Sequence, residues 1–381
     1  MIAGNDRNAS QLTLTRKIWQ INWSLVLLIV LVAGIGFAML YSAANGSFTP
    51  WASAQMIRFG VGLVIMIGIA LIDIRIWLRY AYVIYGLTLI LLLGVEFAGV
   101  VKGGAKRWVE LGFFRIQPSE FIKIALVLAL ARYFHRLNIE DISNPITLIT
   151  PLALVGVPFA LVLRQPDLGT ALLILMGGGA VFFAAGVRLW KFALVVAAGA
   201  TAVPVAWTFL HSYQKDRILT FLTPERDPLG AGYHILQSKI ALGSGGVFGR
   251  GFMQGTQSHL SFLPEKQTDF IFTMLAEEFG LAGGLALLCL YTLLCLYSVA
   301  IALRSSNHFG RLVAIGVTFT FFLFVFINIA MVMGLLPVVG LPLPLISYGG
   351  TAMLTVMAGF GLVICVYIHR DVRMGRSGEG R

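Results

Sequence analysis

The sequence predicts an all-α, polytopic membrane protein, and two features of the chain support this fold class. Hydrophobic residues make up 58% of the 381 residues and charged residues 12%, about half the charged fraction of a typical soluble domain. Long apolar runs recur along the chain, whereas the alternation of apolar and polar residues that is typical of membrane barrels is absent. The predicted fold is therefore a bundle of helices in a bilayer.

Windows of about 20 apolar residues, the length of a helix that crosses a bilayer, predict ten transmembrane helices. We expect the first to be an uncleaved span, because its apolar run is too long for a signal peptide. The ten spans are expected near 20–42, 51–72, 76–96, 118–135, 146–163, 168–186, 190–210, 269–303, 309–335 and 345–368. They predict a single membrane domain over residues 1–381, with a large extracytoplasmic loop, 211–268, between spans seven and eight.

The distribution of Lys and Arg orients this bundle with both termini in the cytoplasm. In that orientation every cytoplasmic segment contains at least two cations, the short tails 1–18 and 370–381 included. The extracytoplasmic loops at 43–50 and 336–344 contain none.

Two extracytoplasmic segments, 97–117 and 211–268, depart from this rule. Their cations are Lys102, Lys106, Arg107, Arg115, Lys215, Arg217, Arg226, Lys239, Arg250 and Lys266. Positive charge gathered at an outer face favours the binding of an anion. The alternative is that single side chains reach toward lipid phosphates. We expect the longer segment to be a partly helical, functional lid, because structureless loops of this length are uncommon in compact proteins.

Segment 102–123 combines aromatic and cationic residues before an apolar run. Trp108 among the cations predicts a strip that lies in the outer membrane interface, and Pro118 and Ser119 then open the fourth span. Glu120 and Lys123 are three residues apart and share one face of that helix. Opposite charges that enter a membrane are expected to pair with each other or with something nearby.

Three further segments carry polar or irregular sequence between spans. In 164–170, Asp167 precedes the sixth span, either as a helix cap or as a residue that supports the site. The glycines of 233–251 could expose N–H groups to a phosphate, or they could provide only flexibility. The prolines and glycines of 336–351 predict irregular backbone at membrane depth, which is tolerated against protein or a water-filled cavity.

Asp269 stands where the polar loop meets the eighth span, and two interpretations remain open from its position. An ionisable residue at the mouth of a span is expensive and usually functional. Alternatively, Thr268 caps the helix and Asp269 stabilises its first turn through the helix dipole. Glu277 and Glu278 lie deeper on the same helix, and we expect them to be structurally paired.

Taken together, these segments resemble the SEDS family of bacterial cell-wall proteins, which act in shape, elongation, division and sporulation. The resemblance rests on 102–123, 164–170, 233–251, 263–272 and 341–350, and it is stronger to the elongation branch than to the division branch. It implies a ten-span fold and a peptidoglycan glycosyltransferase of the bacterial cytoplasmic membrane, active at the extracytoplasmic side, that polymerises lipid II during cell elongation. It also implies a class B penicillin-binding protein transpeptidase as partner, together with other elongation-complex proteins.

The resemblance assigns roles residue by residue. The proposed catalytic aspartate of the family falls on Asp269. Positions that the family shares are matched by Arg107, Trp108, Glu120, Lys123, Gln237, Ser238 and Lys239. With Lys106, Arg250, Lys266 and Ser347 added, they make up the substrate-binding set that we predict. Many members carry His two residues before the catalytic aspartate, where this chain has Gln267, so a proton relay through that position is in doubt.

The implied reaction joins the C4 hydroxyl of one GlcNAc to C1 of a MurNAc and expels polyprenyl pyrophosphate. An α-linked donor that gives a β-linked product needs one inversion, a general base near the hydroxyl and positive charge near the leaving group. Asp269 is the candidate base. The alternatives are a lipid II flippase, a division polymerase and a scaffold that only recruits a synthase.

The sequence contains no pattern typical of a metal site. The six histidines lack ligand spacing, and the three cysteines fall inside apolar runs. Whether a divalent cation accompanies the pyrophosphate stays open. The net charge of +11 is explained by topology and an anionic lipid substrate, because no basic soluble domain exists to bind nucleic acid. The expected small-molecule partners are lipid II and membrane lipids.

Overall fold

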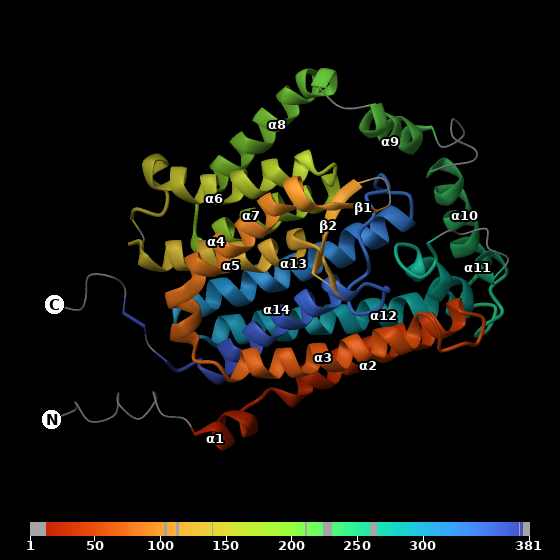
Figure 1. The fold of residues 1–381 in the computed structure, drawn as a ribbon, viewed down its shortest axis with the longest axis horizontal. Helices are drawn as coiled ribbons and strands as arrows, with labels where there is room; N and C mark the ends of the chain where they lie inside the picture. The colour runs from red at the N-terminus through yellow and green to blue at the C-terminus, as the bar shows by residue number, and fades with distance from the viewer. Residues whose placement is uncertain are drawn as a thin grey trace.

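The computed structural model describes residues 13–102, 105–111, 114–138, 140–209, 212–223, 231–259, 265–372 and 374–375. The helices within them are α1 (Leu14–Trp19), α2 (Trp23–Ala43), α3 (Ala52–Leu71), α4 (Ile74–Ala98), α5 (Pro118–Arg136), α6 (Pro145–Arg164), α7 (Leu168–Ala185), α8 (Leu189–Phe209), α9 (Ser212–Leu222), α10 (Ala231–Ser244), α11 (Thr256–His259), α12 (Ile271–Arg304), α13 (His308–Val332) and α14 (Gly350–Ile368). Figure 1 shows them as a bundle with both termini at one end and the start of α12 near the other. This second end is here called the Asp269 end, because Asp269 lies two residues before Ile271, where α12 begins.

Eight of the described helices are long and apolar enough to cross a membrane: α2, α3, α4, α6, α7, α12, α13 and α14. The two other segments that were expected to span the membrane form the helices α5 and α8. Helix α5 carries Glu120, Lys123, Arg132 and Arg136, and it packs against α4, α7 and α13. Its Glu120 and Lys123 are therefore buried by protein rather than exposed to lipid.

The centre of the bundle is α13, which packs against α12, α7, α5 and α14, while α14 also packs closely against α3. Most side chains of α13 and α14 are buried, whereas α3, α4 and α6 keep one face uncovered. Large apolar side chains such as Ile57, Val64 and Ile90 are exposed there. This pattern suits a bundle whose outer surface meets lipid rather than water.

The expected all-α class is incomplete, because segment 100–116 forms an antiparallel sheet of β1 (Val100–Lys102), β2 (Ala105–Leu111) and β3 (Phe114–Ile116). Trp108 pairs with Val100, and Val109 pairs with Ile116. β-branched and aromatic residues favour strands, and this segment is too short and too polar to continue α4. The small sheet leads directly into α5 at Pro118, the first-turn proline of that helix.

The long loop is partly helical, as expected, because its described parts contain α9, α10 and α11. In Figure 1, α8 and α9 run along one edge of the molecule, and α10 and α11 lie at the Asp269 end. Helix α10 packs against α12 and α13. This packing joins the C-terminal part of the loop to the bundle.

Helix α12 is interrupted at Gly280, where the backbone angles are φ 68° and ψ −162°. This conformation is accessible to almost no residue except glycine. The glycine-rich segment 245–251 fills the break with backbone hydrogen bonds. Arg250 N and Gly251 N donate to Glu277 O and Glu278 O, while Leu281 N and Ala282 N donate to Gly246 O and Val247 O. The polar groups freed by the break are thereby satisfied inside the protein, as a membrane environment requires.

Candidate active site

Asp269 lies in the turn 265–270 that precedes α12, and its side chain is half-buried. Helix α12 begins at Ile271 with Phe270 as N-cap and without a side-chain cap, and its first turn contains no acidic residue. The Thr268 hydroxyl bonds to Glu265 instead. The interpretation of Thr268 as a cap and Asp269 as a first-turn residue is therefore wrong, because the turn ends two residues later than that interpretation requires.

The turn packs against the irregular segment 333–349, which joins α13 to α14. Irregular backbone was expected over 336–351, but residues 350 and 351 belong to α14. The Oδ2 atom of Asp269 lies 3.5 Å from the position that a Cβ on Gly340 would occupy. Ser347 Oγ donates to Thr268 O at 2.5 Å and accepts from Leu343 N at 2.7 Å. Ser347 was predicted to bind substrate, but its hydroxyl proton is donated to the turn that carries Asp269.

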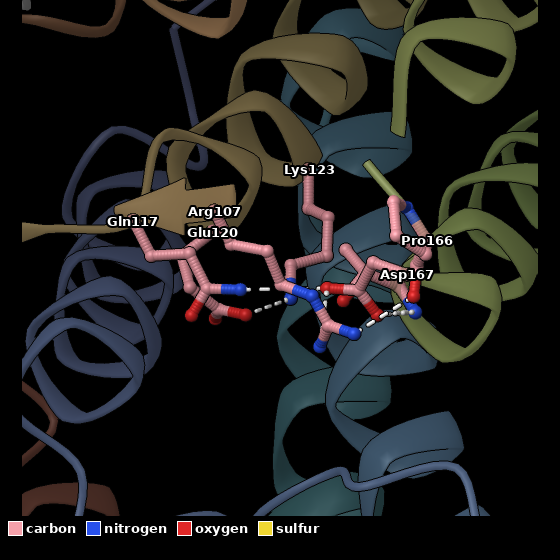
Figure 2. Close-up of polar contacts among 7 residues, drawn as sticks. Arg107, Gln117, Glu120, Lys123, Pro166 and Asp167 are labelled. Carbon is pink, nitrogen blue, oxygen red and sulfur yellow. Dashed lines mark hydrogen bonds and ion pairs between the residues drawn. The ribbon is translucent and has the colours of Figure 1, made fainter. Parts of the chain in front are cut away.

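A second group of charges lies where β2, α5 and α7 meet, and Figure 2 shows it. Arg107 Nη1 is 3.5 Å from Asp167 Oδ2, and Arg107 Nη2 donates to Pro166 O at 2.7 Å. The other oxygen of Asp167 accepts from Thr170 N at 3.2 Å and caps α7. The interpretation of Asp167 as a helix cap is therefore confirmed. The same carboxylate also contacts Arg107, so its support of the site stays a prediction.

Glu120 and Lys123 form the expected pair one helical turn apart. Lys123 Nζ donates to Glu120 Oε1 at 2.7 Å, and the side chains of Lys123 and Glu120 are 2% and 4% exposed, respectively. Lys123 Nζ also lies 4.0 Å from the ring centroid of Phe324 on α13. A buried pair of this kind costs desolvation that the mutual attraction must offset, so its burial at the start of α5 points to a role beyond stability.

Helix α13 connects the charged group with the turn of Asp269. Phe324 touches Lys123, and Asn328, one turn further along the same face, donates to Asp269 O at 3.0 Å. Two adjoining hollows share Phe324 and Val356. One is lined by Glu120 and Lys123 and the other by Ser347 and its neighbours. The structure thus brings Glu120, Lys123, Ser347 and Asp269 to the same side of α13.

The predicted residues of α10 lie at the Asp269 end as well. Ser238 is buried, and its hydroxyl bonds to Thr273 Oγ1 and Val332 O, each at 2.8 Å. Lys239 is exposed, and its Nζ lies 2.8 Å from where a Cβ on Gly334 would stand. Gln237 is half-buried. Ser238 therefore ties α10 to α12 and α13, and its neighbour Lys239 lies over the irregular segment 333–349.

Three cations and one aromatic residue of the predicted substrate-binding set lie on other elements around the site. Trp108 is half-buried in β2, and the side chain of Lys106 lies outside the described part of the chain. Lys266 is half-buried in the turn of Asp269, and burial lowers the pKa of its ammonium group. Arg250 is exposed and donates to Thr256 Oγ1 at 2.9 Å and to Ser244 O at 3.4 Å.

The hypothesis that the glycine-rich segment exposes N–H groups to a phosphate is wrong for three of its donors. Gly249 N donates to Gly245 O, and the N–H groups of Arg250 and Gly251 donate into the break of α12. The segment therefore stabilises the interrupted helix α12 through backbone hydrogen bonds. Glu277 and Glu278 beside it are fully buried, and each carboxylate accepts hydrogen bonds, from Gln257 N and from Ser42 Oγ respectively.

Sequence reasoning missed the buried amides Gln55 and Asn328 and the half-buried amide Gln117. Gln117 Nε2 lies 3.5 Å from Asp167 Oδ2. The detectable signal was an amide inside an apolar run, which is clear for Asn328 between Ile327 and Ile329 and weak for the others. Among the described residues, no group of three His, Cys, Asp or Glu side chains could hold a metal ion.

A family model described as cell cycle protein, which covers FtsW, RodA and SpoVE, matches residues 19–372. This chain belongs to the SEDS family. It is 46% identical over 350 residues to the peptidoglycan glycosyltransferase MrdB of Escherichia coli K12, with 91% of this chain and 94% of MrdB covered.

Two solved structures carry the same SEDS fold. A chain of a complex described as a peptidoglycan synthase that coordinates polymerization and crosslinking matches with a TM-score of 0.81 and 33% identity, over 93% of this chain and 99% of that chain. The RodA protein of Thermus thermophilus matches with a TM-score of 0.70 and 31% identity, over 93% and 98%. The chain is therefore a multi-pass membrane protein with the architecture of RodA.

Proposed function

We propose that this chain is a peptidoglycan glycosyltransferase that polymerises lipid II into glycan strands during cell elongation, as its relatives MrdB and RodA are named for. The observation that carries the proposal is the position of Asp269. Its carboxylate lies in a turn that α13 and segment 341–349 hold in place, on the side of α13 that also faces the buried Lys–Glu pair of α5. A fixed base beside fixed positive charge is the arrangement that this transfer requires.

Asp269 acts as the general base in this proposal. It takes the proton of the C4 hydroxyl of one GlcNAc while that oxygen attacks C1 of a MurNAc. The bond between C1 and the pyrophosphate oxygen breaks, and the polyprenyl pyrophosphate leaves with the bonding electron pair. Lys123 lies beside α13 to stabilise the developing negative charge, and Glu120 and Phe324 hold its ammonium group.

In the same proposal, Arg107 and Lys239 lie at the entrance through which the substrate reaches the site. Arg107 is 22% exposed and braced by Asp167, and Lys239 is exposed over the irregular segment 333–349. Each could meet the pyrophosphate before it reaches the buried pair. Lys106, Trp108, Gln237, Ser238, Arg250, Lys266 and Ser347 complete the proposed substrate-binding set.

The proposed topology has ten spans in the bacterial cytoplasmic membrane, both termini in the cytoplasm and the Asp269 end on the extracytoplasmic side. Helices α5 and α8 supply the two spans beyond the eight apolar ones. The proposed partner is a class B penicillin-binding protein transpeptidase, which the related synthase complex supports by coupling polymerization to crosslinking.

The test is polymerisation of labelled lipid II by the purified chain with its partner, compared with Asp269→Asn. Loss of a general base costs about 10²–10⁴ in rate, so the variant should give almost no polymer while it still binds the partner. Asp216→Asn is the matched control, because Asp216 is an exposed aspartate of α9 in the same loop. Near-normal polymer from Asp269→Asn would contradict the assignment of the base.

A further inference from the structure

Three consecutive backbone carbonyls of the turn that carries Asp269 are held by donors from the last third of the chain. Tyr348 N donates to Gln267 O at 2.9 Å. Ser347 Oγ donates to Thr268 O at 2.5 Å, and Asn328 Nδ2 donates to Asp269 O at 3.0 Å. The backbone on both sides of the Asp269 Cα atom is therefore fixed to α13 and to segment 341–349.

The segment that supplies two of these donors is itself held by Gln55 of α3. Gln55 is completely buried. Its Nε2 donates to Ser347 O at 2.9 Å, and its Oε1 accepts from Gly349 N at 3.3 Å. Both ends of the amide thus bind the irregular backbone on either side of Tyr348.

Asn328 makes the corresponding contact from α13. It is also completely buried, and its Nδ2 donates to Leu341 O at 2.7 Å as well as to Asp269 O. Leu341 opens the segment that ends at Gly349. Asn328 therefore joins the start of this segment to the turn of Asp269, while Gln55 fixes its end.

A buried amide is costly unless its polar atoms are bonded, and an apolar side chain of the same size would suit a packed helix better. The hydrogen bonds of both amides that are named above are made to the backbone of other segments and not to the helix that carries the amide. We propose that Gln55 and Asn328 are positioning residues that set the place of the Asp269 carboxylate for catalysis. This inference rests on the proposed function of Asp269.

The role predicts a defect in turnover rather than in substrate binding. A misplacement of about 1 Å can cost about 10²-fold in rate, so Gln55→Met and Asn328→Leu should lower kcat by about 10-fold to 100-fold with little change in KM. Tyr85→Phe is the matched control, because the Tyr85 hydroxyl also bonds the backbone of a neighbouring helix, at Leu154 O, 2.8 Å away. It should leave kcat within about twofold.

Gln55→Glu separates positioning from a loss of folding. The ionised carboxylate can still accept from Gly349 N, but it has no proton to donate to Ser347 O. Protonation of the carboxylate restores that donor. The ratio of variant to wild-type kcat should therefore rise as the pH falls, whereas the same ratio for Tyr85→Phe should be flat.

Hydrogen exchange supplies a readout apart from activity. In Gln55→Met the amides of Tyr348 and Gly349 should exchange at least 10-fold faster, while those of α13 keep their protection. Wild-type kcat in Gln55→Met and Asn328→Leu, or a flat pH ratio for Gln55→Glu, would overturn the inference even if Asp269→Asn is inactive. An inactive wild-type complex would instead overturn the proposed function and this inference with it.

Discussion

The two halves of the candidate site are held in place by different kinds of interaction. On α5 and at the start of α7, the interactions are ion pairs. Lys123 lies 2.7 Å from Glu120, and Arg107 lies 3.5 Å from Asp167. Around Asp269, neutral donors from Asn328 and segment 347–348 hold backbone carbonyls. In the charged half, carboxylates hold Lys123 and Arg107 in positions where these cations could bind an anionic substrate. In the neutral half, these donors fix the backbone of the turn that carries Asp269.

The largest effect is expected from breaking the charged half. Glu120→Ala leaves Lys123 buried without its carboxylate, and removing one partner of a buried pair costs about 3–5 kcal/mol. Lys123→Ala should do the same to Glu120. We expect each variant to lose polymerase activity and to unfold at a clearly lower temperature than wild type, measured on purified protein in detergent.

The double variant Glu120→Leu with Lys123→Met separates stability from chemistry. Apolar residues of similar size often replace a buried pair without loss of stability, so the unfolding temperature should return toward wild type. Activity should stay absent if Lys123 stabilises the leaving pyrophosphate. Wild-type activity in the apolar double variant would show that the pair is only a structural element.

A smaller effect is expected from the support of the neutral half. Ala at position 280 would adopt a backbone conformation that costs about 1–3 kcal/mol, and its Cβ would collide with the backbone of Val247 and Gly249. Gly280→Ala should therefore displace the first part of α12, lower the unfolding temperature and slow polymerisation.

Gly243→Ala is the matched control for Gly280→Ala. Gly243 lies in α10 with nothing within 4 Å of an added Cβ, and Ala is favoured over Gly in a helix by about 0.5–1 kcal/mol. This control should be as stable as wild type or more so. Equal effects of the two substitutions on unfolding would mean that the break of α12 is not a strained, glycine-dependent feature.

The two halves also differ in how much of them the sequence predicted. The Glu120–Lys123 pair follows from spacing, because residues three apart on a helix share a face and charges in a membrane need partners. The clamp on Asp269 depends on contacts such as Gln55 to Ser347, 292 positions apart. No local pattern encodes such a contact, so the carboxylate was predictable and its support was not.

The features that the sequence did not predict also depend on contacts between distant segments. The spans were predictable because apolar length is a local property, and α2, α6 and α13 lie close to the expected ranges. The sheet at 100–116 and the break at Gly280 were not expected, since both depend on which backbone lies alongside. The glycines of 245–251 could have exposed N–H groups to a phosphate or provided only flexibility. Instead the segment bonds to the break of α12, with Arg250 N and Gly251 N as donors, which only the tertiary structure reveals.

The smallest effect is expected at the exposed entrance. Lys239 is exposed beside segment 333–349, so water and salt screen its charge, and exposed ion pairs contribute about 0.2–1 kcal/mol. Lys239→Ala should therefore raise KM for lipid II by only about twofold to fivefold and leave kcat nearly unchanged. Arg304→Ala is the control, an exposed cation at the opposite end of α12, and it should change neither value.

Ionic strength then distinguishes the exposed cation from the buried one. The Debye length shortens from about 10 Å at 0.1 M salt to about 3 Å at 1 M, so the KM difference between wild type and Lys239→Ala should shrink as salt is added. The defect of Lys123→Ala should persist, because protein rather than electrolyte surrounds that side chain. A Lys123 defect that fades with salt in parallel with that of Lys239 would mean that both cations act through a general surface field, and the contrast between a charged interior and a screened entrance would be wrong.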